Sequence, residues 1–247
     1  MNKHSLPIEI DHLAYFDDTY RTDLKTHILD YGIDDTGTYL IPKQTIFHPK
    51  GGGQPDDQGY IKIGNQEVTV TGLVKKNGFI LHYINLDKAC EPLLSPNVNI
   101  HLYINRATRI KHAKYHTCGH LIAHIIEKKY PDLHGVKGNH FPDQASVTFS
   151  IKKQSEQIER EDYQKFDLKE MQNFLENRIK QYINSDLNSD LNIIIGEENG
   201  RRTIKLEDFL PLKCGGTHLK KTSDIKHVMI SKIKFKKNEG IKISYII

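Results

Sequence analysis

Two short segments of the chain each carry a pair of residues whose side chains can bind transition metals. The first is His116-Thr-Cys-Gly-His120, and the second, much later in the chain, is Cys214-Gly-Gly-Thr-His218. On a helix, residues four apart lie on one face with their Cβ atoms about 6 Å apart. Imidazoles and a thiolate suit Zn²⁺ at about 2.0–2.3 Å, and a fourth ligand or a water completes the tetrahedron. The two segments together predict a zinc site.

A purely structural role fits these residues less well than a metal site does. A buried histidine is often a hydrogen-bonded core residue, and Cys214 could be a small apolar one, but the joint pattern favours a metal. Cys118 lies about 200° round the helix from His116, so we expect it to point away from the site. No HExxH motif is present, and neither segment contains Asp or Glu, which disfavours a protease with a glutamate base. We expect Gly215 and Gly216 to take positive φ, so that Cys214 and His218 converge.

Composition indicates a cytoplasmic protein without a membrane span. The chain has 247 residues, 37% of them hydrophobic, with a mean hydropathy of −0.56. No apolar run approaches the ~20 residues of a membrane helix, and no apolar signal core follows Met1. Three widely separated cysteines predict reduced thiols rather than a disulfide framework.

Positive charge gathers near the end of the sequence. The net charge is +4, and residues 213–242 contain nine lysines but only the acids Asp224 and Glu239. A solvated outer face of a sheet would explain such a cluster. Because it begins beside the second ligand pair, it also suits an anionic polymer such as RNA. Lys234, Lys236 and Lys237 are our candidates for such contacts.

The pattern of apolar residues and turns predicts an α+β protein with a division near residue 104. Residues 1–104 contain short β-propensity runs separated by turn residues, which predicts a small β-barrel domain; the runs are 38–41, 59–63, 67–74, 79–84 and 98–104. Residues 105–247 predict a two-layer sandwich with a mainly antiparallel sheet. Its expected helices are 106–129 and 168–184, the second capped by Asp167, and its expected strands are 145–151, 192–195, 203–206, 228–235 and 242–247.

These motifs carry a family resemblance. HTCGHLIAHII and CGGTHL resemble the HxxxH and CxxxH zinc motifs of the alanyl-tRNA synthetase editing domain. Residues 47–59, FHPKGGGQPDDQG, look like the glycine-rich motif that precedes that domain. The resemblance covers nearly the whole chain from about residue 11, with the three motifs in the family's order. Since nothing here looks like an ATP site, the chain most resembles the freestanding alanyl-tRNA editing proteins of the AlaX type, in their medium-length form.

The resemblance implies a trans-editing enzyme. Its activity would be zinc-dependent hydrolysis of mischarged tRNA(Ala), chiefly Ser-tRNA(Ala) and also Gly-tRNA(Ala). It would bind one Zn²⁺ per chain through four residues that match the family's zinc positions: His116, His120, Cys214 and His218. Six residues match the glycine-rich motif, which we expect near the tRNA acceptor end or the pocket: Gly51, Gly52, Gly53, Gln54, Pro55 and Asp57.

Residues beside the ligands are candidates for the substrate pocket. A site that hydrogen-bonds a substrate hydroxyl rejects the analogue lacking it by up to about 10⁴–10⁵. Our hypothesis is that Thr117 or Thr217 helps to recognise the serine hydroxyl, with Gly215 and Gly216 beside it. Two stretches depart from the family's pattern, Val136-Lys-Gly-Asn139 and Ser146-Val-Thr-Phe149, and both bear on amino-acid selectivity.

Three further functions stay open at this point. One is the same chemistry on another mischarged tRNA, such as Ser-tRNA(Thr). Another is a non-catalytic RNA-binding module that zinc holds together. The third is a zinc hydrolase of small esters or amides. We expect tRNA as the partner and no membrane association. The lack of the C-terminal extension of longer relatives favours a monomer.

Overall fold

Two compact units make up the chain in the computed structural model, which describes residues 13–87, 92–151, 163–184, 193–198, 201–206, 209–236 and 240–247. One unit comprises Met1–Gly51 with Asp56–Arg109, and the other comprises Gly52–Pro55 with Ile110–Ile247. The tip of the glycine-rich motif therefore belongs to the second unit, together with both ligand pairs.

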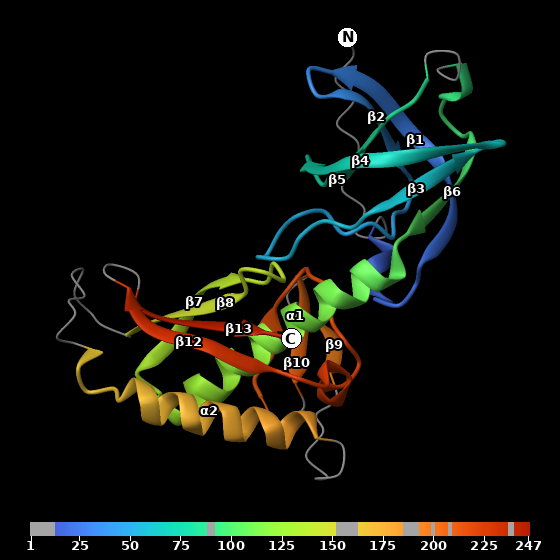
Figure 1. Ribbon diagram of the computed structural model, residues 1–247. Helices are drawn as coiled ribbons and strands as arrows, with labels where there is room; N and C mark the ends of the chain where they lie inside the picture. The colour runs from blue at the N-terminus through green and yellow to red at the C-terminus, as the bar shows by residue number, and fades with distance from the viewer. Residues whose placement is uncertain are drawn as a thin grey trace. The chain divides into compact units, whose positions relative to one another are not determined.

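The first unit is a closed barrel of six antiparallel strands in the order β1-β2-β5-β4-β3-β6 (Figure 1). The strands are β1 (Asp23–Asp34), β2 (Gly37–Pro42), β3 (Gly59–Ile63), β4 (Gln66–Lys76), β5 (Phe79–Ile84) and β6 (Asn99–Ile104). Alternate residues of β6, namely Ile100, Leu102 and Ile104, are buried in the barrel core. This two-residue period is what a sheet with one apolar face requires.

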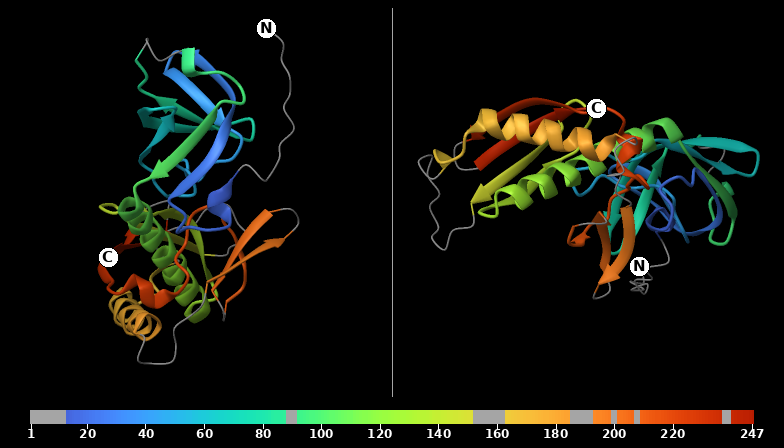
Figure 2. Two further views of the ribbon diagram at one scale, coloured as in Figure 1. Left: turned by 90° about the vertical axis from the view of Figure 1, so that its right-hand side faces the viewer. Right: turned by 90° about the horizontal axis from the view of Figure 1, so that it is seen from below.

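The second unit contains two antiparallel sheets. Four strands pair in the order β12-β13-β8-β7, and three short ones pair in the order β11-β10-β9. Their bounds are β7 (Leu133–Asn139), β8 (Ser146–Ile151), β9 (Ile193–Glu198), β10 (Arg201–Leu206), β11 (Leu212–Lys213), β12 (Met229–Lys236) and β13 (Gly240–Ile246). The β9–β10 ladder extends away from the four-stranded sheet (Figure 2).

Two helices pack against the four-stranded sheet. Helix α1 (Arg106–Lys129) contacts β13 where the Tyr245 hydroxyl donates to the Tyr115 carbonyl at 2.8 Å. Helix α2 (Leu168–Ile183) contacts β12, and the Asp167 side chain caps its start by accepting from the backbone N–H groups of residues 169 and 170. Among the residues described, neither helix has the length and apolarity needed to cross a lipid bilayer.

The predicted α+β class, the barrel and the antiparallel pairing are confirmed. Both helices lie where the sequence placed them. The prediction was wrong in omitting β1, β7 and the two-residue β11. Strand β1 is mostly polar (DLKTHILDYGID) and β7 contains Gly135 and Gly138, so neither shows the alternation or β-propensity by which a strand is recognised.

Candidate metal centre

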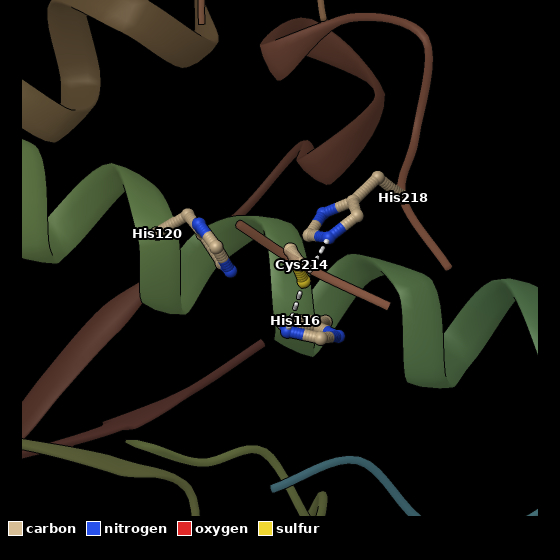
Figure 3. Close-up of side chains that lie close together, drawn as sticks. All are labelled: His116, His120, Cys214 and His218. Carbon is tan, nitrogen blue, oxygen red and sulfur yellow. Dashed lines mark hydrogen bonds between the residues drawn. The ribbon is translucent and has the colours of Figure 1, made fainter. Parts of the chain in front are cut away.

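Four candidate ligand side chains meet in the second unit (Figure 3). His116 and His120 come from adjacent turns of α1, and Cys214 and His218 come from the segment after β11. Their four ligand atoms lie within 4.8 Å of one another. The Cys214 Sγ atom is 3.4 Å from His116 Nε2 and 3.2 Å from His218 Nε2.

This donor set fits a Zn²⁺ ion. In a tetrahedral zinc site with bonds of about 2.0–2.3 Å, neighbouring ligand atoms are roughly 3.3–3.8 Å apart, which is close to the two sulfur–nitrogen separations. His116 and His218 are buried, and His120 and Cys214 are half-buried. The Nδ1 atom of His120 is buried with no hydrogen-bond partner among the described residues.

Gln54 fixes the orientation of His116. Its Oε1 atom accepts the Thr217 backbone N–H at 3.0 Å, and its Nε2 atom donates to the Thr217 hydroxyl at 2.9 Å. Because Oε1 can only accept, the His116 Nδ1 atom, 2.7 Å away, must carry the hydrogen and donate it. The His116 Nε2 lone pair then faces Cys214, as a metal ligand requires.

The other side of the cluster is held in a similar way. The Thr117 hydroxyl oxygen lies 3.3 Å from His218 Nδ1 and accepts the Leu219 backbone N–H at 3.1 Å. Arg202, from β10, donates to the carbonyls of residues 214 and 216, each at 2.9 Å. Thr117 and Arg202 thus position the turn that carries Cys214 and His218.

Close packing explains the need for glycine at position 216. A Cβ atom there would lie 2.1 Å from His116 Cε1 and 2.9 Å from Gln54 Oε1. Neither Gly215 nor Gly216 has a positive φ, so the expected reason for these glycines was wrong. Gly216 is required because its backbone approaches the His116 ring, while Gly215 is exposed.

Burial shifts the pKa values of His120 and Cys214 toward their uncharged forms. Desolvation, helped by the nearby His140 and His124, lowers the pKa of His120 to about 3. Burial raises the pKa of the Cys214 thiol above its usual value, against the opposing effects of the Gly216 N–H and Arg202. In the metal-free state His120 and Cys214 are therefore neutral, and binding a metal as thiolate would release a proton.

His140 also lies at this centre, and the sequence analysis missed it. Its ring stacks on His116 at 4.5 Å, and its Nδ1 atom lies 2.9 Å from the Tyr245 hydroxyl oxygen. Burial lowers the pKa of His140 to about 4. A Cβ atom at Gly119 would lie 2.3 Å from the His140 ring. A glycine in the middle of the helix was the available signal that another group approaches there.

Several curated proteins align with nearly the whole chain. It is 27% identical over 230 residues to the alanyl-tRNA editing protein AlaX-L of Pyrococcus horikoshii, an alignment covering 92% of this chain and 55% of that protein. It is 28% identical over 238 residues to AlaX-M of Methanosarcina acetivorans, covering 91% of this chain and 94% of that protein. The predicted resemblance to the alanyl-tRNA editing proteins is confirmed.

Similarity extends to the alanine–tRNA ligases. The ligase of Haloquadratum walsbyi is 26% identical over 235 residues, which cover 90% of this chain and 24% of the ligase. The chain thus spans about half the length of AlaX-L, about a quarter of the ligase and nearly all of AlaX-M. No family model matches the chain.

The glycine-rich motif divides into two parts. Gly52 and Gly53 have positive φ (56° and 78°), and a Cβ at Gly53 would lie 2.4 Å from the Gly138 carbonyl oxygen. Gly51 is exposed, and Pro55 is buried beside Gln54. These residues bring Gln54 to the ligand cluster.

Asp57, also in this motif, belongs to the first unit. It is buried, accepts from the Arg109 Nε atom at 3.0 Å, and accepts the His48 backbone N–H at 2.6 Å. The Arg109 side chain is fully buried as well and donates to the Thr19 carbonyl. The structure therefore gives Asp57 a buried ion pair within the barrel unit.

Two of the three candidate RNA-contact lysines lie on a solvent-exposed part of the four-stranded sheet. Lys234 and Lys236 are exposed on β12, as is Lys232. Lys237 lies outside the described residues. Val136, at the first departure from the family's pattern, is 52% exposed at a bulge of β7.

Proposed function

We propose that this protein is a zinc-dependent aminoacyl-tRNA deacylase that edits mischarged tRNA(Ala) in trans. Its main substrate would be Ser-tRNA(Ala), with Gly-tRNA(Ala) as a second. The observation that carries the proposal is the convergence of His116, His120, Cys214 and His218 on one point. The similarity to proteins named for alanyl-tRNA editing supports the choice of substrate.

The ligand cluster would hold one Zn²⁺ ion per chain. When bound, that ion supplies a Lewis acid able to polarise the ester carbonyl or lower the pKa of a water molecule. The protein's own contribution is positional: Gln54 keeps the His116 Nε2 lone pair directed at the cluster, and Thr117 supports His218. Outer partners of this kind orient metal-binding imidazoles and raise their basicity.

Selectivity would come from polar groups beside the ligands. The Thr217 hydroxyl accepts from Gln54, and the Thr217 side chain is fully buried beside the ligand His218. We keep Thr217 and Thr117 as the candidate groups that recognise serine, with Gly215 and Gly216 forming the backbone wall. Replacing a hydroxyl-bonding group by an apolar one removes this kind of discrimination.

Transfer RNA would bind largely through lysine–phosphate contacts. The exposed Lys234 and Lys236 supply positive charge on one face of the sheet, and Lys237 follows them in the sequence. Such contacts make affinity fall steeply with salt. We further propose that the protein acts as a monomer in the cytoplasm.

A second candidate function has one observation in its favour. Four protein ligands suffice to close a tetrahedral site, as in structural zinc sites, whereas catalytic sites keep one position open. A zinc-stabilised RNA-binding module would have the same cluster and no turnover. Editing of Ser-tRNA(Thr) would keep the chemistry and change only the tRNA.

The test compares two cysteine substitutions. Cys214→Ala removes the thiolate, so we expect loss of both zinc binding and Ser-tRNA(Ala) hydrolysis. Cys118→Ala removes a fully buried thiol outside the cluster and should retain both. Zinc content by mass spectrometry and release of labelled serine are the readouts. Full hydrolysis by metal-free Cys214→Ala protein would exclude the proposed mechanism.

A further inference from the structure

A pocket of about 270 Å³ lies between the end of α1, helix α2 and Phe209. Its lining residues are cationic or aromatic, apart from Ile125. The cations are Lys128, Lys129 and Arg178, and the aromatic residues are Phe174, Tyr182 and Phe209. None of these described lining residues is acidic. Glu207 and Asp208 precede Phe209 in the sequence and lie outside the described residues.

Each cation of the pocket lies over an aromatic ring. Lys128 Nζ is 5.3 Å from the Phe209 centroid, and Lys129 Nζ is 5.3 Å from the Phe174 centroid. The Arg178 guanidinium is 4.9 Å from the Tyr182 ring and donates to its hydroxyl at 2.8 Å. Both lysines are exposed, so their charges are open to a ligand while the rings hold their positions.

A row of side chains joins this pocket to the ligand cluster. His116, His120, His124 and Lys128 are spaced four residues apart and therefore lie along one side of α1. The His120 and His124 rings are 6.5 Å apart, and His124 stacks on Phe209 at 4.7 Å with the planes 12° apart. From His120 to Lys128 the helix rises by about 12 Å.

We propose that this pocket binds single-stranded RNA, and that in the working complex it holds the 3′ strand of tRNA just before the nucleotide carrying the ester. The second part rests on the proposed function, which places the ester at the cluster. Phosphates would contact Lys128 and Lys129, and a base would stack on the half-buried Phe174 ring or on the Arg178 plane. Cationic grooves with aromatic platforms are how proteins hold single strands.

The test measures the salt dependence of tRNA binding in two charge-matched variants. Lys128→Gln/Lys129→Gln removes the two exposed pocket charges. Lys169→Gln/Lys180→Gln removes two exposed charges of α2, about 180° round the helix from Arg178. The probe is uncharged tRNA(Ala), with fluorescence anisotropy giving Kd at several salt concentrations. Each lost phosphate contact should reduce the slope of log K against log salt by about 1.

We expect the pocket variant to bind intact tRNA(Ala) more weakly with a slope reduced by about 2, and the α2 control to match the wild type. With tRNA(Ala) trimmed of its single-stranded 3′ nucleotides, wild type and pocket variant should bind alike. Equal slopes for the two variants on intact tRNA would overturn the proposal. So would a reduced slope that persists on trimmed tRNA, since the contacts would then be to the duplex.

This experiment is independent of the deacylase activity. Binding of uncharged tRNA needs no ester, and zinc content serves as the check that the cluster is intact in every variant. If the pocket variant shows the reduced salt slope but the wild-type protein hydrolyses no aminoacyl-tRNA, only the proposed function is contradicted. If the wild-type protein deacylates aminoacyl-tRNA but the pocket variant binds tRNA with an unchanged salt slope, only this inference is contradicted.

Discussion

At the residue scale, the candidate centre depends on which imidazole nitrogen carries a hydrogen. The amide of Gln54 settles this for His116, because the same oxygen already accepts the Thr217 N–H. Gln54 is fully buried, so its amide has no water to exchange partners with. Metal affinity should therefore depend on a residue that is not a ligand.

Gln54→Ala should weaken zinc binding or catalysis by about 10–100-fold, the usual effect of losing an outer partner of a ligand. The variant keeps all four ligands, so it should still bind zinc at high concentration. Competition with a chromogenic chelator measures the affinity. Gln66→Ala, at an exposed position of β4, is the matched control. Wild-type affinity and activity in Gln54→Ala protein would show that His116 needs no such partner.

The sequence predicted individual residues better than their partners. Four-residue spacing singled out His116 and His120, because a helix places such residues on one face. Nothing in the spacing linked Gln54 to Thr217, which lies 163 residues away, or brought His140 onto His116. Such pairings depend on how distant segments pack, which a local pattern does not contain.

At the element scale, the barrel depends on one buried ion pair between a loop and a helix. Arg109, in the first turns of α1, pairs with Asp57 of the glycine-rich motif, with side chains 0% and 1% exposed. Breaking a buried pair by removing one partner leaves a charge without compensation. Asp57 thus has a structural role in the first unit that its place in the motif did not reveal.

Asp57→Ala should destabilise the protein by about 3–5 kcal/mol, as expected when half of a buried pair is removed. Urea unfolding followed by circular dichroism measures the loss. Asp35→Ala, at an exposed turn, should change stability by less than about 0.5 kcal/mol. If Asp57 instead contacts tRNA, the variant would keep its stability and bind tRNA more weakly.

The local sequence of each helix and strand determines whether it could be predicted. Helix α1 has a long apolar stripe and ends before Pro131, so its bounds follow from the sequence. Strands β1 and β7 have polar or glycine-containing sequences and are held by their neighbours: β1 pairs with both β2 and β6, and β7 with β8. Tertiary pairing therefore overrides weak local propensity in these two strands.

At the scale of the whole molecule, the candidate centre combines three distant parts of the sequence. Gln54 precedes α1 by about fifty residues, and Cys214 and His218 follow α1 only after strands β7 to β11 and helix α2. The α+β class could be predicted because it depends on the order of elements. The convergence at one point was suggested only by the chemistry that the ligand types share.

The measurement that tests this account most directly is hydrolysis of Ser-tRNA(Ala) beside Ala-tRNA(Ala), by zinc-loaded and by zinc-stripped protein. We predict that the zinc-loaded protein hydrolyses Ser-tRNA(Ala) rapidly and Ala-tRNA(Ala) slowly. The zinc-stripped protein should be inactive and should recover its activity when zinc is returned. If the loaded protein hydrolyses neither ester, the deacylase proposal is wrong and a zinc-stabilised RNA-binding protein explains the cluster better.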